Sequence, residues 1–141
     1  FFSPSIHISG PAKGSTLRHN IIHVTKKVNS DVQRCLLSAT QSYGDADSTT
    51  VCENLFYVAE NSCFLLGNST NNFFKDNCYL GNIKNIPEDE GATYENKTYS
   101  NMIKNDLSGV ESLKPFLHSV NTPTGELQIV DSDAINSFFS K

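Results

Sequence analysis

The chain has 141 residues, of which 38% are hydrophobic and only 18% charged, with 15 acidic against 11 basic side chains. That length is typical of one domain, so we expect a single domain over residues 1–141. The low charge excludes a disordered polyelectrolyte and a basic nucleic-acid-binding protein. No run approaches the roughly 18 apolar residues of a membrane-spanning helix, so we expect no membrane span.

Residues 1–13 are expected to form an N-terminal strand or arm. Ile6 and Ile8 alternate with polar residues, a period of two that puts alternate side chains on one face of a sheet. Such a strand ordinarily pairs within its own domain, but it can also add to a neighbouring molecule. Ile6 and Ile8 are therefore candidate residues of an assembly strand, and head-to-tail donation would build a filament.

The next part, residues 14–81, contains all four cysteines and is expected to form the core. A β-branched run predicts a strand over 20–25. Ser30 and Gln33 have the spacing of a capping box, which predicts a helix over 30–39 with an apolar stripe.

Two apolar runs follow that helix. Residues 51–58 and 63–66 flank a polar turn and predict an antiparallel hairpin. The fold class expected from these elements is a small disulfide-stapled α+β domain, with a short helix packed on an antiparallel sheet and additional C-terminal helices.

The cysteines predict two disulfides. No two of them have the close C-x-x-C spacing of a structural zinc or redox site, and their number is even. Four cysteines allow three pairings, and the shortest loops favour Cys35 with Cys52 and Cys63 with Cys78. The sequence alone does not choose among the three.

Three sequons predict N-linked glycans. Asn68 and Asn96 each begin a standard acceptor triplet, and Asn61 begins a weaker one that ends in Cys63. Together with the cysteines they indicate an extracellular, secreted glycoprotein. Because the chain starts at Phe1 without a leader pattern, we expect that any signal peptide has been removed.

The last two parts are an exposed acidic loop over residues 82–97 and a helical part over 98–141. An amphipathic pattern predicts a helix from Tyr99 to Val110, and Pro115 requires a break before it. A strand is expected over 126–130, followed by a terminal helix that places Ile135, Phe138 and Phe139 on one face. No internal repeat is apparent.

Metal and catalytic patterns are weak. His19 and His23 are four residues apart but lack a third ligand nearby, and Asp45 and Asp47 do not continue into a calcium-binding loop. There is no nucleophile elbow, P-loop or dinucleotide-binding motif. We therefore expect no catalytic residue, no metal and no cofactor.

The order of elements resembles the PAN/apple family of extracellular modules. The resemblance covers residues 14–80 and depends on Cys35-Leu36-Leu37, on Cys52-Glu53-Asn54-Leu55-Phe56-Tyr57 and on Cys63-Phe64-Leu65. It implies that Cys35 pairs with Cys63, which leaves Cys52 to pair with Cys78. The second helical cysteine of the family pattern falls at Ala39. Members of that family act as adhesion and ligand-binding modules.

The function expected from these features is a non-enzymatic extracellular glycoprotein that acts as an interaction, adhesion or structural module. Its partner would be protein, carbohydrate or another copy of itself. One alternative is a self-assembling filament or surface-coat subunit linked through the N-terminal strand. A second alternative is a secreted hydrolase.

Overall fold

The computed structural model describes residues 2–8, 10–24, 33–39, 44–58, 61–95, 111 and 113–140. The described strands are β1 (Phe2–His7), β2 (Thr16–Arg18), β3 (Ile21–Val24), β4 (Gln33–Ser38), β5 (Thr50–Cys52), β6 (Leu55–Val58), β7 (Ser62–Leu65), β8 (Phe73–Lys75), β9 (Cys78–Leu80), β10 (Ile83–Lys84), β11 (Thr93–Glu95), β12 (Leu117–Thr122) and β13 (Gly125–Val130). The described helices are the 3-10 turn η2 (Lys114–Phe116) and the α-helix α2 (Ser132–Phe139).

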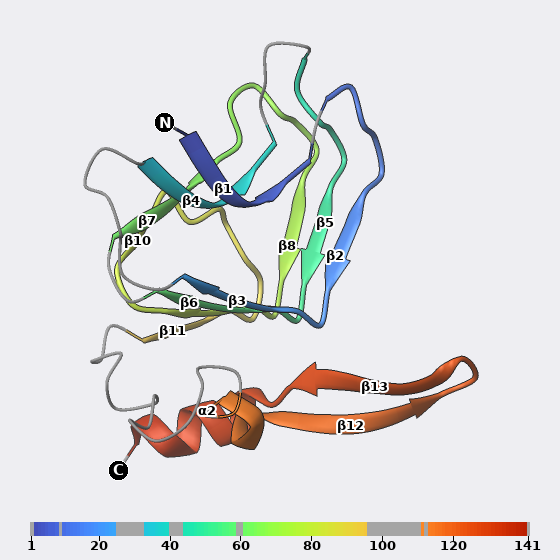
Figure 1. The fold of residues 1–141 in the computed structure, drawn as a ribbon, viewed down its shortest axis with the longest axis vertical. Helices are drawn as coiled ribbons and strands as arrows, with labels where there is room; N and C mark the ends of the chain where they lie inside the picture. Colours follow the sequence, from blue (N-terminus) through green and yellow to red (C-terminus); the bar gives the residue numbers. More distant parts are fainter. Residues whose placement is uncertain are drawn as a thin grey trace.

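Strands β1 to β11 form three parallel sheets around a common interior (Figure 1). The sheets have the strand orders β1-β4-β7-β10, β2-β5-β8 and β11-β9-β6-β3. Each of the first three turns of the chain adds one strand to each sheet, and the fourth adds a strand to the first and third of these sheets, so the fold is a parallel β-helix, or β-solenoid. We call β1–β3 the first coil, β4–β6 the second, β7–β9 the third, and β10 with β11 the fourth.

The same corner recurs in the first three coils. Residues 16–24, 50–58 and 73–80 each run through a strand, a left-handed residue, an asparagine and a second strand. The left-handed residues are His19, Glu53 and Asp76, with φ of 55°, 55° and 53°. This conformation redirects the chain from sheet β2-β5-β8 to the next sheet. The expectation of no internal repeat is therefore wrong.

The interior of the solenoid is filled by apolar side chains from all three sheets. Its fully buried members include Leu36, Leu37, Val51 and Phe56 of the second coil. The rings of Phe56 and Tyr79 stack at 5.4 Å, and Tyr94 stacks on Tyr79 at the same distance. These parallel contacts follow from the register, which places aromatic residues of successive coils opposite each other.

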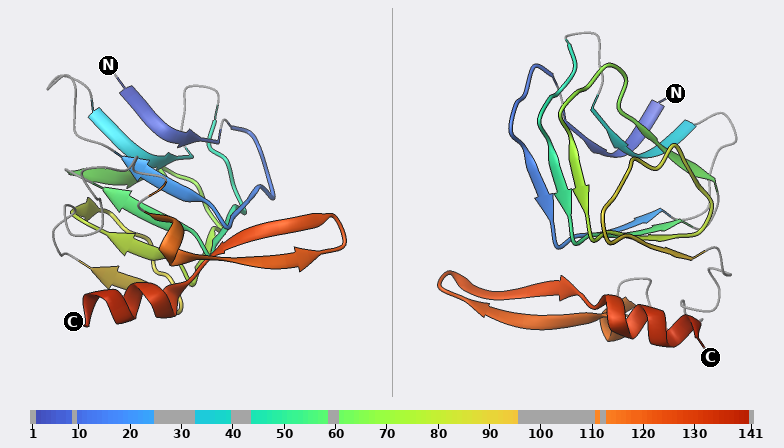
Figure 2. Two further views of the ribbon diagram at one scale, coloured as in Figure 1. Left: turned by 60° about the horizontal axis from the view of Figure 1, so that its bottom comes forward. Right: turned by 180° about the vertical axis from the view of Figure 1, so that it is seen from behind.

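A second apolar core lies on the outer face of sheet β11-β9-β6-β3. There η2 and α2 cover the sheet (Figures 1 and 2). The buried members of this core are Leu55, Tyr57, Cys78, Leu80, Leu113, Phe116 and Ile135. Because one face of the sheet meets the interior and the other meets the C-terminal segment, all four residues of β6 are buried.

The rest of the C-terminal segment is the antiparallel hairpin β12-β13, which extends beyond the sheets (Figure 2). Its Ser119, Glu126 and Gln128 side chains form one exposed polar face. Asp131 then caps α2 by accepting a hydrogen bond from the Ala134 amide at 2.8 Å. In the described residues, no helix is long and apolar enough to span a bilayer.

Several predicted elements are confirmed. Strands were expected at the N-terminus, over 20–25 and over 126–130, and the structure has β1, β3 and β13 there. The terminal helix is α2. The helix predicted from Tyr99 to Val110 lies outside the described residues.

The expected α+β class is wrong, because the described residues form mainly parallel strands with one α-helix. Residues 33–38 of the predicted helix form β4, whose apolar side chains are buried between β1 and β7. The predicted hairpin is also wrong, because β6 and β7 belong to different sheets. Residues 82–95, expected as an exposed loop, contribute β10 and β11.

The predicted disulfides are a further correction, because no disulfide joins the four cysteines, all of which are described. Cys52 lies opposite Arg18 and Lys75 in one sheet, whereas Cys78 lies opposite Leu55 and Thr93 in another. Cys35 and Cys78 are buried. The core is therefore held by strand pairing and packing, with no disulfide staple.

Candidate functional site

Asn20, Asn54 and Asn77 form a ladder along the repeated corner. Asn20 Nδ2 donates to Asn54 Oδ1 at 3.1 Å, and Asn54 Nδ2 donates to Asn77 Oδ1 at 2.9 Å. The backbone amides of Asn20 and Asn54 donate to the same two oxygens at 3.0 and 2.9 Å. Asn54 and Asn77 are completely buried, so these bonds satisfy polar groups that cannot reach water.

The ladder is incomplete at the first coil. Asn54 Nδ2 donates back to the Leu17 carbonyl of the preceding coil at 3.0 Å, and Asn77 Nδ2 donates back to the Val51 carbonyl at 2.9 Å. Within the described part of the chain, Asn20 has no such acceptor behind it, and its Oδ1 accepts no hydrogen bond. Asn20 therefore lacks the contacts that a preceding coil would supply.

The backbone is open at the same end. Each strand of the first coil is the terminal strand of its sheet in the described residues. Ile6, Ile8 and Leu17 pack against the interior core but remain only partly buried. A sheet edge of this kind presents unpaired backbone groups to another strand, so we take the first coil as the candidate functional site.

The other end of the ladder closes on Asp89. One carboxylate oxygen, Oδ2, accepts hydrogen bonds from Asn77 Nδ2 and from the Tyr79 hydroxyl, both at 2.6 Å. The second oxygen, Oδ1, is buried and has no partner among the described residues. Burial of the Tyr79 ring, followed by its hydrogen bond to Asp89, raises the pKa of Tyr79 well above its usual range.

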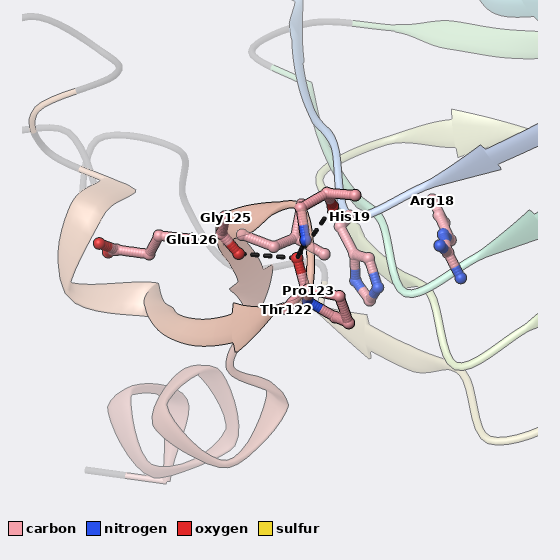
Figure 3. Close-up of a pocket in the computed structure, with 8 residues that line it drawn as sticks. Arg18, His19, Thr122, Pro123, Gly125 and Glu126 are labelled. Carbon is pink, nitrogen blue, oxygen red and sulfur yellow. Dashed lines mark hydrogen bonds between the residues drawn. The ribbon is translucent and has the colours of Figure 1, made fainter.

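A pocket of about 500 Å³ lies where the tip of the β12-β13 hairpin meets the first coil. His19 lies beside Pro123 in this pocket, and the Glu126 carboxylate is directed away from it (Figure 3). The His19 side chain is only 10% exposed, and its Nε2 lies 3.1 Å from Glu53 Oε2. Its Nδ1 is buried without a hydrogen-bond partner among the described residues.

A second open pocket, of about 440 Å³, lies at the opposite end of sheet β2-β5-β8. It is lined by Phe73 of β8, which is 50% exposed, and by Glu88, Asp89 and Glu90 of the fourth coil. The fourth coil contacts β8 through a single bridge between Lys75 and Glu90. This end of the solenoid is therefore acidic and only partly covered.

The structure separates the histidines and acids considered as metal ligands. His19 pairs with Glu53, while His23 stacks on Tyr57 at 5.5 Å. Asp47 Oδ1 accepts a hydrogen bond from the Thr70 amide at 2.8 Å and so has a structural role. Among the residues that the structure describes, no three side chains of metal-ligating type come together.

The predicted assembly strand lies at the open end. Ile6 pairs in register with Leu37, because β1 runs parallel to β4 of the same chain. The edge of β1 that faces away from β4 is the one that another strand could join. Ile6 and Ile8 themselves pack toward the interior core, so the intramolecular pairing is the one observed.

Two of the three predicted glycosylation sites are described, and both lie on the surface. Asn68 is exposed, and Asn61 is exposed and accepts a hydrogen bond from Asn82. Asn96 lies outside the described residues. Glycosylation stays a prediction.

No family model, curated protein or solved structure matches this chain. The class of protein is therefore defined by its own geometry, which is that of a parallel β-solenoid with an asparagine ladder. The segments on which the resemblance to PAN/apple modules depended form β4 to β7 of this solenoid, and the resemblance stays a prediction.

The ladder residues were missed by the sequence analysis. The available signal was an asparagine that follows an apolar residue by three positions and precedes an apolar run, at Asn20, Asn54 and Asn77. The separations of 34 and 23 residues are unequal, so a fixed-period search does not find them.

Proposed function

We propose that this protein is a non-enzymatic structural and interaction module that binds β-structured partners through the open edge of its first coil. The incomplete ladder at Asn20 carries this proposal. In coils two and three the asparagine receives hydrogen bonds from the coil before it and donates one back. Asn20 presents the same groups to whatever occupies that position.

A peptide tests this proposal directly. Its sequence copies residues 50–58, the corner of the second coil, with serine in place of Cys52. We expect the peptide to bind and to slow hydrogen exchange at the amides of β2 and β3, because it adds one strand beside β2 and one beside β3. A matched peptide with alanine in place of Asn54 should bind at least tenfold more weakly, since it cannot complete the ladder. Equal binding of both peptides, or binding by neither, would contradict the proposal.

The expected extracellular, glycosylated setting belongs to the same proposal. It is supported by the exposed Asn68 sequon, but the absence of disulfides in the described cysteines removes one of its two supports. Intact mass of natively sourced protein tests it, because glycans at Asn68 or Asn96 would add to the 15.6 kDa chain.

The hairpin pocket favours a second candidate function, the binding of a protein or carbohydrate ligand. Arg18 and His19 line this pocket, and the exposed Arg18 guanidinium offers hydrogen-bond donors for recognition. A glycan array probed with the protein and with Arg18→Ala would show ligands that depend on Arg18. If no glycan distinguishes the two proteins, carbohydrate recognition in this pocket is wrong.

A further inference from the structure

We infer that the partner of the first coil is the fourth coil of a second copy of this chain, so that copies stack head to tail. This inference rests on the proposed function, because it names what the open edge binds. It is carried by the match between the two ends in charge, in register and in hydrogen-bonding groups.

The two ends of the solenoid carry opposite charge. Residues 2–24 contain one lysine, one arginine and three histidines but no acid, whereas residues 82–95 contain one lysine and four carboxylates. The last coil of one copy and the first coil of another therefore attract each other. Two like ends repel, which disfavours head-to-head contacts.

The register places an acid of one end beside a base of the other. Arg18 lies opposite Cys52, Cys52 opposite Lys75, and Lys75 opposite Glu90. These four residues form one row along the solenoid. If a second copy continues the row, its Arg18 follows Glu90 at about one strand spacing of roughly 4.8 Å. Both side chains are exposed in the single chain, so they are free to meet.

A second row of residues, on the neighbouring sheet, also runs from a residue of the first coil to an acid of the fourth. His23 lies opposite Tyr57, Tyr57 opposite Leu80, and Leu80 opposite Glu95. Continuing this row brings the His23 of the next copy beside Glu95. The Arg18–Glu90 row brings opposite charges together. Burial lowers the pKa of His23, so the second row places a polar ring beside Glu95 and adds no full charge pair. The two rows together fix the direction and the register of stacking.

One hydrogen bond of the repeated corner also continues across the contact, although the ladder position of the fourth coil is Ala92 and carries no side-chain amide. Asp89 precedes Glu90 and so takes the row position of Leu17, whose carbonyl accepts from Asn54 Nδ2. Stacking brings the Asn20 side-chain amide of the next copy to Asp89. The backbone carbonyl of Asp89 would then accept from Asn20 Nδ2 of the next copy, as the Leu17 carbonyl accepts from Asn54 Nδ2, which also shares its hydrogens among three acceptors.

The apolar residues at the two ends complete the surface. Ile6, Ile8 and Leu17 at one end and Ile83, Ile86 and Ala92 at the other are only partly buried in the interior core. Stacking would cover both sets and extend the core between copies. Because the two surfaces differ, the contact is heterologous and leaves a free end on each side, so it repeats into a linear assembly.

Charge reversal tests the inference. Analytical ultracentrifugation of the wild-type protein over a range of concentrations should show reversible self-association that weakens with salt. Arg18→Glu and Glu90→Arg alone should each weaken it at least tenfold. An equimolar mixture of the two variants should assemble again as an alternating stack, because both contacts between unlike copies then pair an acid with a base, and the double variant R18E/E90R should also assemble again. The matched controls Lys114→Glu and Glu111→Arg reverse exposed charges in the C-terminal segment and should assemble like the wild type.

The outcomes separate this inference from the proposed function. If the wild type stays monomeric but binds the corner peptide, the homotypic inference is wrong and the proposed function stands. If the single variants assemble like the wild type, or if their mixture stays monomeric, the Arg18–Glu90 register is wrong. If the wild type neither assembles nor binds the peptide, both are wrong. Circular dichroism of each variant verifies that the loss does not come from unfolding.

Discussion

Asn54 Nδ2 lies 2.9 Å from Asn77 Oδ1, and neither side chain is exposed. Asn54→Ala should therefore destabilise the protein by about 2–4 kcal/mol, because the buried groups around it lose their partners. Urea denaturation measures this change. The exposed Asn82→Ala should cost less than about 0.5 kcal/mol. Equal effects would show that the ladder does not stabilise the fold.

The four cysteines should fall into a fast-reacting and a slow-reacting group toward a thiol reagent. In the native protein Cys52 and Cys63 are partly exposed and should react quickly, whereas Cys35 and Cys78 are buried and should react only on unfolding. Burial also raises the pKa of the Cys35 thiol to about 11, so little thiolate forms at neutral pH. Mass spectrometry of peptides from a timed labelling experiment gives the order.

The same reagent tests the absence of disulfides. Unfolded protein that has not been reduced should label at all four cysteines. Labelling of none would show that the predicted disulfides form after all.

Alkaline pH should destabilise the fold. Burial raises the folded-state pKa of Cys35 from 9.0 to about 11, and burial together with its hydrogen bond to Asp89 also raises the pKa of Tyr79 above its ordinary value of 10.0. Because these groups hold their protons more tightly when folded, their contribution to stability is complete below pH 9. It is lost as the unfolded state deprotonates, at up to about 1.4 kcal/mol per pH unit for each group.

Urea midpoints between pH 8 and pH 11 measure this loss. Tyr79→Phe should reduce the decline above pH 10, because its unfolded state has one proton fewer to release. Tyr94→Phe, at a ring that is 56% exposed, should retain most of the decline. A midpoint independent of pH in the wild type would contradict the prediction.

Gly81→Ala should be among the more disruptive single-methyl additions. A Cβ at Gly81 would lie 2.2 Å from the Val58 carbonyl oxygen, and φ there is +96°. Gly14→Ala is the matched control, because Gly14 also has positive φ but open space around its Cβ position. We expect Gly14→Ala to cost about 1 kcal/mol and Gly81→Ala at least twice as much. Thermal melts of the two variants give the comparison.

Strands could be predicted from the sequence best where one face of the strand meets solvent and the other meets the core. The alternation at Ile6 and Ile8 identified β1, and the β-branched run identified β3. Prediction failed at β4, where Cys35, Leu36 and Leu37 are all completely buried. A buried parallel strand has no alternation, and the same residues also fit one face of a short helix.

The sequence alone could not indicate the candidate site at the first coil. The importance of Asn20 depends on its lying in the first of the described coils, and that of Asp89 depends on a row that begins with Leu17. Both relationships exist only once the coils are stacked in space. The strand predicted at Ile6 and Ile8 lies at a sheet edge among the described residues, its side chains pack inward, and its role in assembly stays a prediction.

The sheet that separates the two cores could shift its strand pairing by one residue with little loss of hydrophobic burial. In β6, shifting the pairing by one residue would exchange Phe56 and Val58 with Leu55 and Tyr57, which replaces apolar side chains by apolar side chains on both faces. Hydrophobic burial, which ordinarily penalises such a slip, is therefore nearly neutral here. The penalty comes instead from the corner, because a slipped Asn54 would leave Asn20 and Asn77 without their partners. The buried amides of Asn54 and Asn77 therefore fix the register of this sheet, and a variant that loses one of them should shift its strand pairing while remaining folded.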